Sequence, residues 1–416
     1  MLDRSEQSAA AAAQKHKRLF FVANCTCSPL IGGGDIHFFH MAEGAIAGGF
    51  DVSFFGGHAL QKHLEARGLA ARVILTDQKP LAKVDMVHLK GQIILFFDYV
   101  GRFFRTLPLL KRIQPDDLAY AVTDYWFDAW PAAFSRARAK MLVLGMDSPT
   151  LREIALRTRP DVPATRVTSI YYWLSQNISL RLFRRCRNKK VFYVHPLMRP
   201  RLLRLGYAES ELVFISNGLN LEVAASIPAQ PRKYDVAWTG RVHRQKGVDD
   251  LLGALKHLAQ KIPDFRAILI GRLQDQLGPR IEELGLTNQV EFSGFVSEEE
   301  KFRLLKSSRL FLMPSHYESW GIVIGEALGS DVPVVAYKLD AYPAIFGELV
   351  QYVPCFDQNR FQQVAADAVV ALRKGKNLLA PDALDEFKKR NSWSTAQKIF
   401  CETARELAAQ TGMGTG

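Results

Sequence analysis

Short apolar runs alternate with segments of helical spacing through the second half of the chain. Segment 248–258 places leucines three or four positions apart, which is typical of an amphipathic helix. Ser297 precedes three glutamates, and this order favours a helix start because the hydroxyl caps free amides and the acids meet the helix dipole. Such alternation predicts βαβ units and a parallel sheet. We expect strands at 234–240, 267–271, 290–296, 310–314 and 332–337, and helices at 248–258, 274–284, 297–305 and 321–328.

The first half repeats the alternation with longer irregular stretches. A turn signature at 216–220, followed by Pro228 and Pro231, marks a domain boundary. Two open α/β domains of similar size place a ligand cleft between the carboxyl ends of their strands. In this half we expect strands at 19–23, 51–55, 84–89, 118–122 and 141–144, and helices at 34–47 and 170–187. For the whole chain we expect a disordered tail over 1–17, a first Rossmann-like domain over 18–215, a second over 216–394, and a C-terminal helix near 395–410 that joins the first domain.

The composition is that of a folded, water-exposed protein. Of 416 residues, 48% are hydrophobic and 23% are charged, which excludes global disorder. No apolar run reaches the ~18 residues of a membrane span, and run 19–23 is too short for a signal peptide. Five cysteines give no disulfide framework, so we expect a reducing cytoplasm. Cys25 and Cys27 lack a matching Cys or His pair, and we expect no metal.

Basic residues concentrate in the first half. Residues 1–220 hold 30 Lys and Arg against 18 Asp and Glu, whereas residues 221–416 hold 24 of each, so the net charge of +12 lies before residue 221. An anionic membrane surface is the expected partner, and nucleic acid is not, because no RNA-recognition, KH or zinc-finger pattern is present. A solubilising basic surface is the alternative. The densest run follows the aromatic segment 170–174 and contains Arg181, Arg184, Arg185, Arg187, Lys189 and Lys190; a second patch contains Arg102, Phe103, Phe104, Arg105, Lys111 and Arg112.

Segment 240–247 (GRVHRQKG) combines a strand end, two cations and a helix start. The free N–H groups of a helix amino terminus, with Arg241 and Lys246 beside them, favour a diphosphate site. The spacing is not that of a Walker loop. A basic surface loop is the alternative.

Two glutamates stand eight positions apart near the next loop. Glu318 lies between an expected strand and helix, and Glu326 lies inside that helix among apolar residues. A carboxylate in such a place is costly without a partner, and a ribose or sugar diol offers two donors. The alternatives are that Glu318 assists a helix cap and that Glu326 forms an ordinary ion pair.

The pair Glu318 and Glu326 resembles the E-x7-E motif of the family-4 retaining GT-B glycosyltransferases. The surrounding text P-S-x-x-E-S-W-G-I-V-I-G-E-A-L over 314–328 is similar to that family as well. Four further segments resemble family motifs in the same order along the chain. They are G-G-x-D at 32–35, F-I-S-N-G-L-N at 214–220, the cationic segment 240–247 and V-E-F-S-G-F-V at 290–296.

The resemblance implies a GT-B fold, an α/β class with two Rossmann-like domains, and a set of donor-binding residues. Arg241 and Lys246 would bind the diphosphate and stabilise its departure, Glu318 would bind the donor sugar, and Glu326 would take the ribose. No D-x-D triplet is present, which agrees with metal-independent transfer. A histidine that the family often carries after strand 141–144 is missing, which leaves Asp147 as the candidate sugar or acceptor contact. The other donor-binding residues implied are Gly33, Gly34, Val296, Trp320, Gly321 and Ile322.

The predicted function follows from this resemblance. It is retaining transfer of a hexose-type sugar from a nucleotide-diphosphate donor to a glycan or lipid-linked acceptor, in cell-surface polysaccharide or glycolipid synthesis. No cofactor is expected, and the expected location is the cytoplasm or the inner face of the cell membrane. The alternatives are a nucleotide-sugar epimerase on the same fold and a non-catalytic nucleotide-sugar-binding partner of another transferase.

Overall fold

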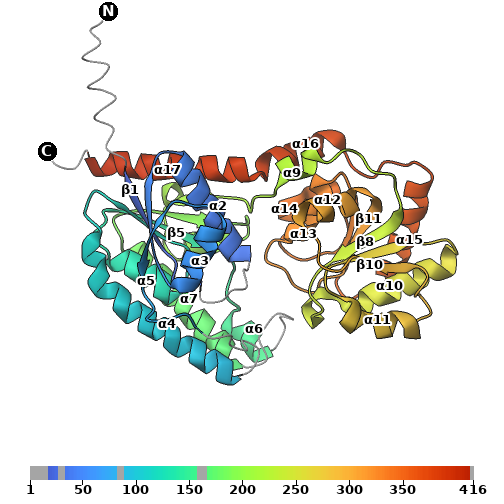
Figure 1. Ribbon diagram of the computed structural model, residues 1–416, viewed down its shortest axis with the longest axis horizontal. Coiled ribbons are helices and arrows are strands. Elements are labelled where there is room, and N and C mark those ends of the chain that lie inside the picture. Colours follow the sequence, from blue (N-terminus) through green and yellow to red (C-terminus); the bar gives the residue numbers. More distant parts are fainter. Residues whose placement is uncertain (1–16, 27–32, 82–88, 157–165, 413–416) are drawn as a thin grey trace, which may run out of the picture.

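The computed structural model describes residues 17–26, 33–81, 89–156 and 166–412, which form two parallel β-sheets covered by helices (Figure 1). The tail expected over 1–17 and the strand expected at 84–89 therefore lie almost wholly outside the described residues. Leu89, the last residue of that expected strand, begins a helix instead.

The first sheet has seven strands in the order β3-β2-β1-β4-β5-β6-β7, and every pairing is parallel. Its central strands are mostly apolar and buried, as expected where helices cover both faces of a sheet. The order reverses between β1 and β4, and a ligand crevice is expected at such a switch point. The strands are β1 (Arg18–Val22), β2 (Asp51–Gly56), β3 (Arg72–Leu75), β4 (Leu118–Ala121), β5 (Ala139–Leu144), β6 (Asn188–Tyr193) and β7 (Leu212–Phe214).

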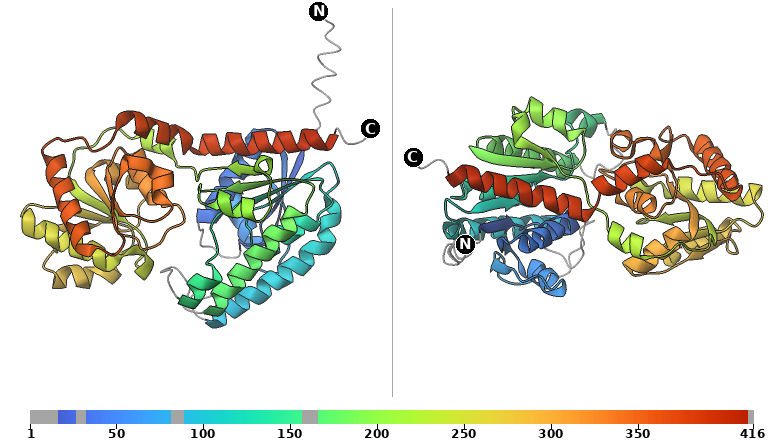
Figure 2. Two further views of the ribbon diagram at one scale, coloured as in Figure 1. Left: turned by 180° about the vertical axis from the view of Figure 1, so that it is seen from behind. Right: turned by 90° about the horizontal axis from the view of Figure 1, so that it is seen from above.

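Seven helices of the first domain pack around this sheet. Two long ones, α4 and α7, run side by side on the side of the domain opposite the last helix of the chain (Figures 1 and 2). The helix expected at 170–187 is present as α7, but α7 ends at Arg184. Lys189 and Lys190 belong to β6. The helices are α2 (Gly33–Ala47), α3 (His58–Ala66), α4 (Leu89–Leu109), α5 (Trp126–Phe134), α6 (Leu151–Leu156), α7 (Arg166–Arg184) and α8 (Met198–Arg204).

The second sheet has six parallel strands in the order β10-β9-β8-β11-β12-β13. Ser297 caps α12 as expected, since its side chain accepts from Glu300 N at 3.2 Å. The strands are β8 (Tyr234–Thr239), β9 (Ala267–Ile270), β10 (Val290–Phe292), β11 (Ser308–Met313), β12 (Val334–Tyr337) and β13 (Val350–Val353). The helices are α9 (Leu221–Ser226), α10 (Val248–Lys261), α11 (Gln274–Glu283), α12 (Glu298–Lys306), α13 (Ile322–Gly329), α14 (Tyr342–Phe346), α15 (Gln358–Arg373) and α16 (Pro381–Arg390).

The last helix, α17 (Trp393–Gly412), returns from the second domain to the first (Figure 1). Phe400 is fully buried in the first core, where its ring lies 5.0 Å from that of Tyr120 and 5.5 Å from that of Phe192. Near the crossing, Leu219 N donates to Asn391 O at 2.8 Å. The two segments that connect the domains are thus hydrogen-bonded to each other.

Candidate functional site

A cavity of about 530 Å³ lies between the two domains, at the carboxyl ends of both sheets. Its volume is within the range of small-molecule sites. The second domain lines it with Asn217, Arg241, Gln245, Lys246, Tyr317, Glu318, Ser319, Trp320, Gly321, Ile322 and Val323. The first domain lines it with Gly34, His37, Val122, Thr123, Asp124, Tyr125, Val143, Gly145, Met146, Tyr172 and Val194.

Two loops of the second domain hold each other in place at this cavity. His316 N donates to Gln245 O at 2.8 Å, and Gln245 Nε2 donates to Tyr317 O at 2.8 Å. Gly247 has a φ of 61°, and a Cβ there would lie 1.9 Å from Pro314 O. Only glycine therefore allows the cationic loop to approach the loop that carries Glu318 so closely.

The two expected cations differ in their surroundings. Arg241 is exposed and forms no ion pair with any residue that the structure describes. Lys246 forms an ion pair with Glu318, and both side chains are largely buried, at 15% and 13% exposure. Ser315 Oγ also donates to Glu318 Oε1, at 3.3 Å. The cavity thus contains one unpaired cation and one neutralised pair.

Glu326 lies outside the set of residues that line the cavity. Its carboxylate accepts from Lys301 Nζ of α12 at 2.6 Å, so the ion pair considered as the alternative is present. Burial raises the pKa of Glu326, and the charge of Lys301 opposes that shift. Lys301 therefore already offsets the cost of burying the Glu326 carboxylate, for which a sugar was the expected partner.

The other expected residues divide into two groups. Gly34, Trp320, Gly321 and Ile322 line the cavity. Gly321 has a φ of 84° and precedes α13, a conformation that favours glycine. Gly33 begins α2, next to Gly34. Val296 packs against the second core and does not line the cavity.

Asp147 does not line the cavity, and another carboxyl does. Asp147 Oδ1 accepts from Arg201 at 2.7 Å and borders a separate hollow. The carboxyl with which the first domain lines the cavity belongs to Asp124, which follows β4. Sequence reasoning missed this residue. Its position directly after an expected strand was the available signal. Burial raises the pKa of Asp124 to about 7, against a hydrogen bond from Gln176 at 2.8 Å.

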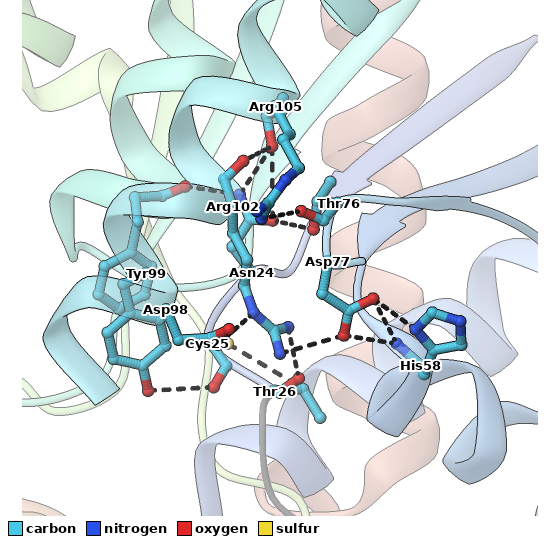
Figure 3. A network of polar contacts seen from close by, with 12 residues as sticks. Asn24, Cys25, Thr26, His58, Thr76, Asp77, Asp98, Tyr99, Arg102 and Arg105 are labelled. Atoms are coloured by element: carbon cyan, nitrogen blue, oxygen red, sulfur yellow. Dashed lines mark hydrogen bonds and ion pairs between the residues drawn. The ribbon is translucent and has the colours of Figure 1, made fainter. Parts of the chain in front are cut away.

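A buried polar network in the first domain corrects one expectation about the basic surface (Figure 3). Arg102 is fully buried and is not part of a surface patch. Its guanidinium donates to Asp98 at 2.6 Å, to Asp77 at 3.3 Å and to Thr26 O at 3.2 Å. His58 Nδ1 lies 2.6 Å from the same Asp77. Arg102 therefore holds the segment that follows β1 through its bond to Thr26 O. The two carboxylates, Asp98 and Asp77, offset its buried charge.

Within the described ranges, no group of three or more His, Cys, Asp or Glu side chains is arranged to hold a metal ion.

Solved structures with the same arrangement define the fold class. The chain superposes with sucrose-phosphate synthase of Thermosynechococcus elongatus at a TM-score of 0.70 and 17% identity, covering 95% of this chain and all of that one. It superposes with Anabaena HepE, solved with UDP and glucose, at a TM-score of 0.66 and 19% identity, covering 94% of this chain and all of that one. The two domains and their facing cleft are those of a GT-B fold.

The sequence of the second domain matches a family model. Residues 222–377 match the model described as glycosyl transferases group 1. The phosphatidyl-myo-inositol mannosyltransferase of Mycobacterium leprae is 33% identical over 171 residues, which is 39% of this chain and 44% of that protein. The D-inositol 3-phosphate glycosyltransferase of Mycobacterium sp. (strain KMS) is 33% identical over 126 residues, 29% of this chain and 28% of that protein. The chain spans less than half the length of these curated relatives.

Proposed function

We propose that the protein transfers a sugar from a nucleotide-diphosphate donor to a glycan or lipid-linked acceptor, with retention and without a metal. The observation that carries this proposal is the meeting of Arg241, Lys246 and Glu318 at one interdomain cavity. Preorganised cations beside a departing diphosphate are the kind of group that usually contributes most to such catalysis. The family of the second domain and the UDP held by a protein of the same fold support the choice of donor.

The contacts of the cavity residues in this structure indicate how the donor would bind. The diphosphate would bind Arg241, which is unpaired among the described residues, and would replace Glu318 at Lys246. Glu318 would then be released to accept hydrogen bonds from the donor sugar. Glu326, paired with Lys301, would accept from the ribose hydroxyls. The exchange at Lys246 replaces one ion pair by other charge-assisted contacts, so it leaves no buried charge unpaired.

Retention and metal independence are parts of the same proposal. With two cations at the leaving group, a metal has no necessary role, and the departing diphosphate can accept the proton of the attacking hydroxyl. Addition of a chelator should leave the rate unchanged. Loss of activity in a chelator that magnesium or manganese restores would contradict the two-cation arrangement.

Donor binding is tested by thermal shift against nucleotide diphosphates and their sugars. A ligand of the native state raises stability in proportion to RT ln(1 + [L]/Kd). Release of free nucleotide diphosphate that requires acceptor identifies a transferase. Binding without any release identifies the non-catalytic alternative, and a change of the sugar's configuration without acceptor identifies the epimerase.

Two helices of the first domain support a membrane as the place of the acceptor, because both expose several apolar side chains while they bury some polar ones. On α4, Arg102 and Thr106 are fully buried, and on α7, Gln176 and Ser179 are buried. Phe97 is 65% exposed. The exposed apolar residues of the two helices are Ile93, Ile94, Phe96, Phe97, Phe104, Val167, Ile170, Leu174 and Ile178.

These side chains form one surface, which we call the apolar face, because α4 and α7 are in contact. Thr168 Oγ1 donates to Gln92 Oε1 at 3.2 Å, and the rings of Phe96 and Tyr171 lie 5.7 Å apart. An exposed apolar area of this kind marks an interaction site in most proteins.

Cations border the apolar face and favour an anionic lipid surface as its partner. Arg181, Arg184 and Arg185 are exposed at the end of α7, and Lys111 and Arg112 are exposed just after α4. Lys189, in contrast, is buried and paired with Glu211, so it does not belong to the exposed cations beside the apolar face. Apolar side chains next to cations are the features of interfacial membrane binding. Within the described residues, no helix is long and apolar enough to cross a membrane.

A further inference from the structure

His37, a residue that lines the cavity, has a buried and unsatisfied polar atom. It lies in the first turns of α2, is 4% exposed and lines the cavity from the first domain. Its Nε2 has no hydrogen-bond partner in the part of the chain that the structure describes. Burial lowers the pKa of His37 to about 4, so the ring is neutral at pH 7. A buried polar atom without a partner costs free energy unless a ligand or water supplies one.

Asp124 lines the same wall. β1 and β4 are adjacent parallel strands, so the segments that follow them, which carry His37 and Asp124, leave the sheet at the same edge. Asp124 is 4% exposed, and it forms no ion pair with any described residue. It is the only acidic side chain among the described residues of the first domain that line the cavity.

A second set of contacts fixes the orientation of the Asp124 carboxyl. The backbone N–H of Ser148 donates to Gln176 Oε1 at 2.9 Å, and Arg201 also donates to that oxygen. The amide nitrogen of Gln176 must therefore face the other way, where it donates to Asp124 Oδ2 at 2.8 Å and to Met146 O at 2.7 Å. One carboxylate oxygen of this cavity-lining residue is thereby held in place.

We propose that His37 and Asp124 form the acceptor subsite and bind the hydroxyl groups of a neutral sugar or polyol. This inference rests on the proposed transfer reaction. A hydroxyl both donates and accepts, so it can satisfy a carboxylate oxygen and an imidazole nitrogen at once. A phosphate or carboxylate at this wall would face Asp124, whereas the cations stand on the opposite wall. The anionic part of an acceptor therefore points away from the subsite, and a ring hydroxyl points into it.

An aromatic pair next to Asp124 fits the same ligand class. Tyr125 and Tyr172 both line the cavity, and their rings stack with centroids 5.0 Å apart and 26° between planes. Tyr172 donates its hydroxyl hydrogen to Met146 O at 3.0 Å, which fixes the ring. A rigid aromatic surface beside a carboxylate offers the C–H face of a sugar ring an apolar contact while its hydroxyls bind the carboxylate.

The test is a binding measurement on the full chain with ¹⁵N-labelled histidine. The probes are methyl α-D-glucopyranoside, methyl α-D-mannopyranoside and myo-inositol, with glucose 6-phosphate as the anionic comparison. The His37 ring signals are assigned by their loss in His37→Gln. We expect at least one neutral probe to shift these signals saturably, and Asp124→Asn to weaken that probe about 10-fold or more, the scale of one hydrogen bond to a charged group.

Asp128→Asn is the matched control. Asp128 is a neighbouring buried carboxyl that accepts from Asn24 N at 2.6 Å and from Thr123 Oγ1 at 2.6 Å, and it does not line the cavity. Probe affinity should survive this change. Failure of every neutral probe to move the His37 signals of the wild type overturns the subsite, as does wild-type affinity in Asp124→Asn. Nucleotide-diphosphate binding, measured by calorimetry on the same samples, reports separately on the proposed function, because its absence would contradict that function alone.

Discussion

The two walls of the cleft are built in different ways. The second-domain wall consists mainly of two continuous loops, 241–246 and 317–323, and it holds both cations and Glu318. The first-domain wall draws on the run 122–125 and on residues from several other segments, and its described part has one carboxyl, Asp124. The difference shows that the cations needed at a leaving group can come from one short segment of sequence. A surface for neutral hydroxyls is instead assembled from distant segments.

The sharpest test of this comparison removes a cation from the second-domain wall. Lys246→Ala or Arg241→Ala should lower kcat roughly 10²–10³-fold, the usual loss for one preorganised charge stabiliser. Circular dichroism and Tm should stay close to wild type in Arg241→Ala, because that side chain is exposed and without an ion pair among the described residues. A folded variant that turns over at the wild-type rate would remove the clamp from the mechanism.

The packing of the two loops is tested at Gly247. Gly247→Ala must place a Cβ against Pro314 O in a left-handed backbone conformation. We expect a loss of about 2–4 kcal/mol in the free energy of unfolding, from strain and overpacking together. Urea titration measures it. Gly375→Ala, where φ is also positive, at 80°, but open space surrounds the new Cβ, should cost only the strain part. Equal losses in the two variants would show that the loops do not depend on this approach.

The first-domain wall is tested through the titration of Asp124. Burial raises the pKa of Asp124 to about 7, so the folded chain keeps a proton that the unfolded chain releases near pH 4. This carboxyl therefore destabilises the fold increasingly as pH rises from about 4 to 7. Asp124→Asn removes this destabilisation. The free energy of unfolding of the variant, relative to that of the wild type, should rise between about pH 4 and 7 by on the order of 1–3 kcal/mol. Nearby Asp147, Arg201 and the hydroxyl of Tyr172 are common to both proteins and cancel in the difference. A pH-independent difference between variant and wild type would refute the shift.

The smallest effect per residue is expected at the apolar face of α4 and α7 and the cations beside it. Each cation near an anionic surface is worth about 1 kcal/mol, and the attraction should fade as salt shortens the screening length to ~3 Å at 1 M. The protein should sediment with anionic vesicles at low salt and wash off at high salt. Charge reversal at Arg181, Arg184 and Arg185 should abolish sedimentation and leave nucleotide binding intact.

A second variant separates the apolar part of that surface from its charge. Phe97→Ser with Phe104→Ser should weaken binding at every salt concentration, since burial of apolar area is not screened. Equal sedimentation with neutral and anionic vesicles, or an unaffected triple variant, would leave the arginines as solubilising charge. Competition by short duplex or single-stranded nucleic acid would favour that partner instead.

The second domain and its wall could be predicted from the sequence because their signals are local. Ser297 caps α12 through a residue three positions on, and Arg241, Lys246 and Glu318 lie in loops between apolar runs that the pattern locates. Strand 290–296 was predicted too long, since β10 ends at Phe292 and the chain turns at Gly294, which has a φ of 67°.

The first domain was harder because hydropathy does not give the orientation of a helix when its outer face is apolar. Arg102 looked like a surface cation, yet the partners that stabilise it inside, Asp77 and Thr26, are 25 and 76 positions away. His37 and Asp124 meet at one wall only because β1 and β4 are neighbours in the sheet. Asp147, chosen for its place after β5, is instead held by Arg201.

The return of α17 to the first sheet has a consequence for the order in which the chain matures. Phe400 packs against Phe21, Tyr120 and Phe192, so the core of the first domain contains a side chain that is synthesised only after the second domain. Domains generally fold as units during synthesis, from the N-terminus onward. Here the core of the first domain can be completed only after the second domain has been translated. Until α17 is made, the apolar surface that Phe400 covers in the folded protein stays uncovered.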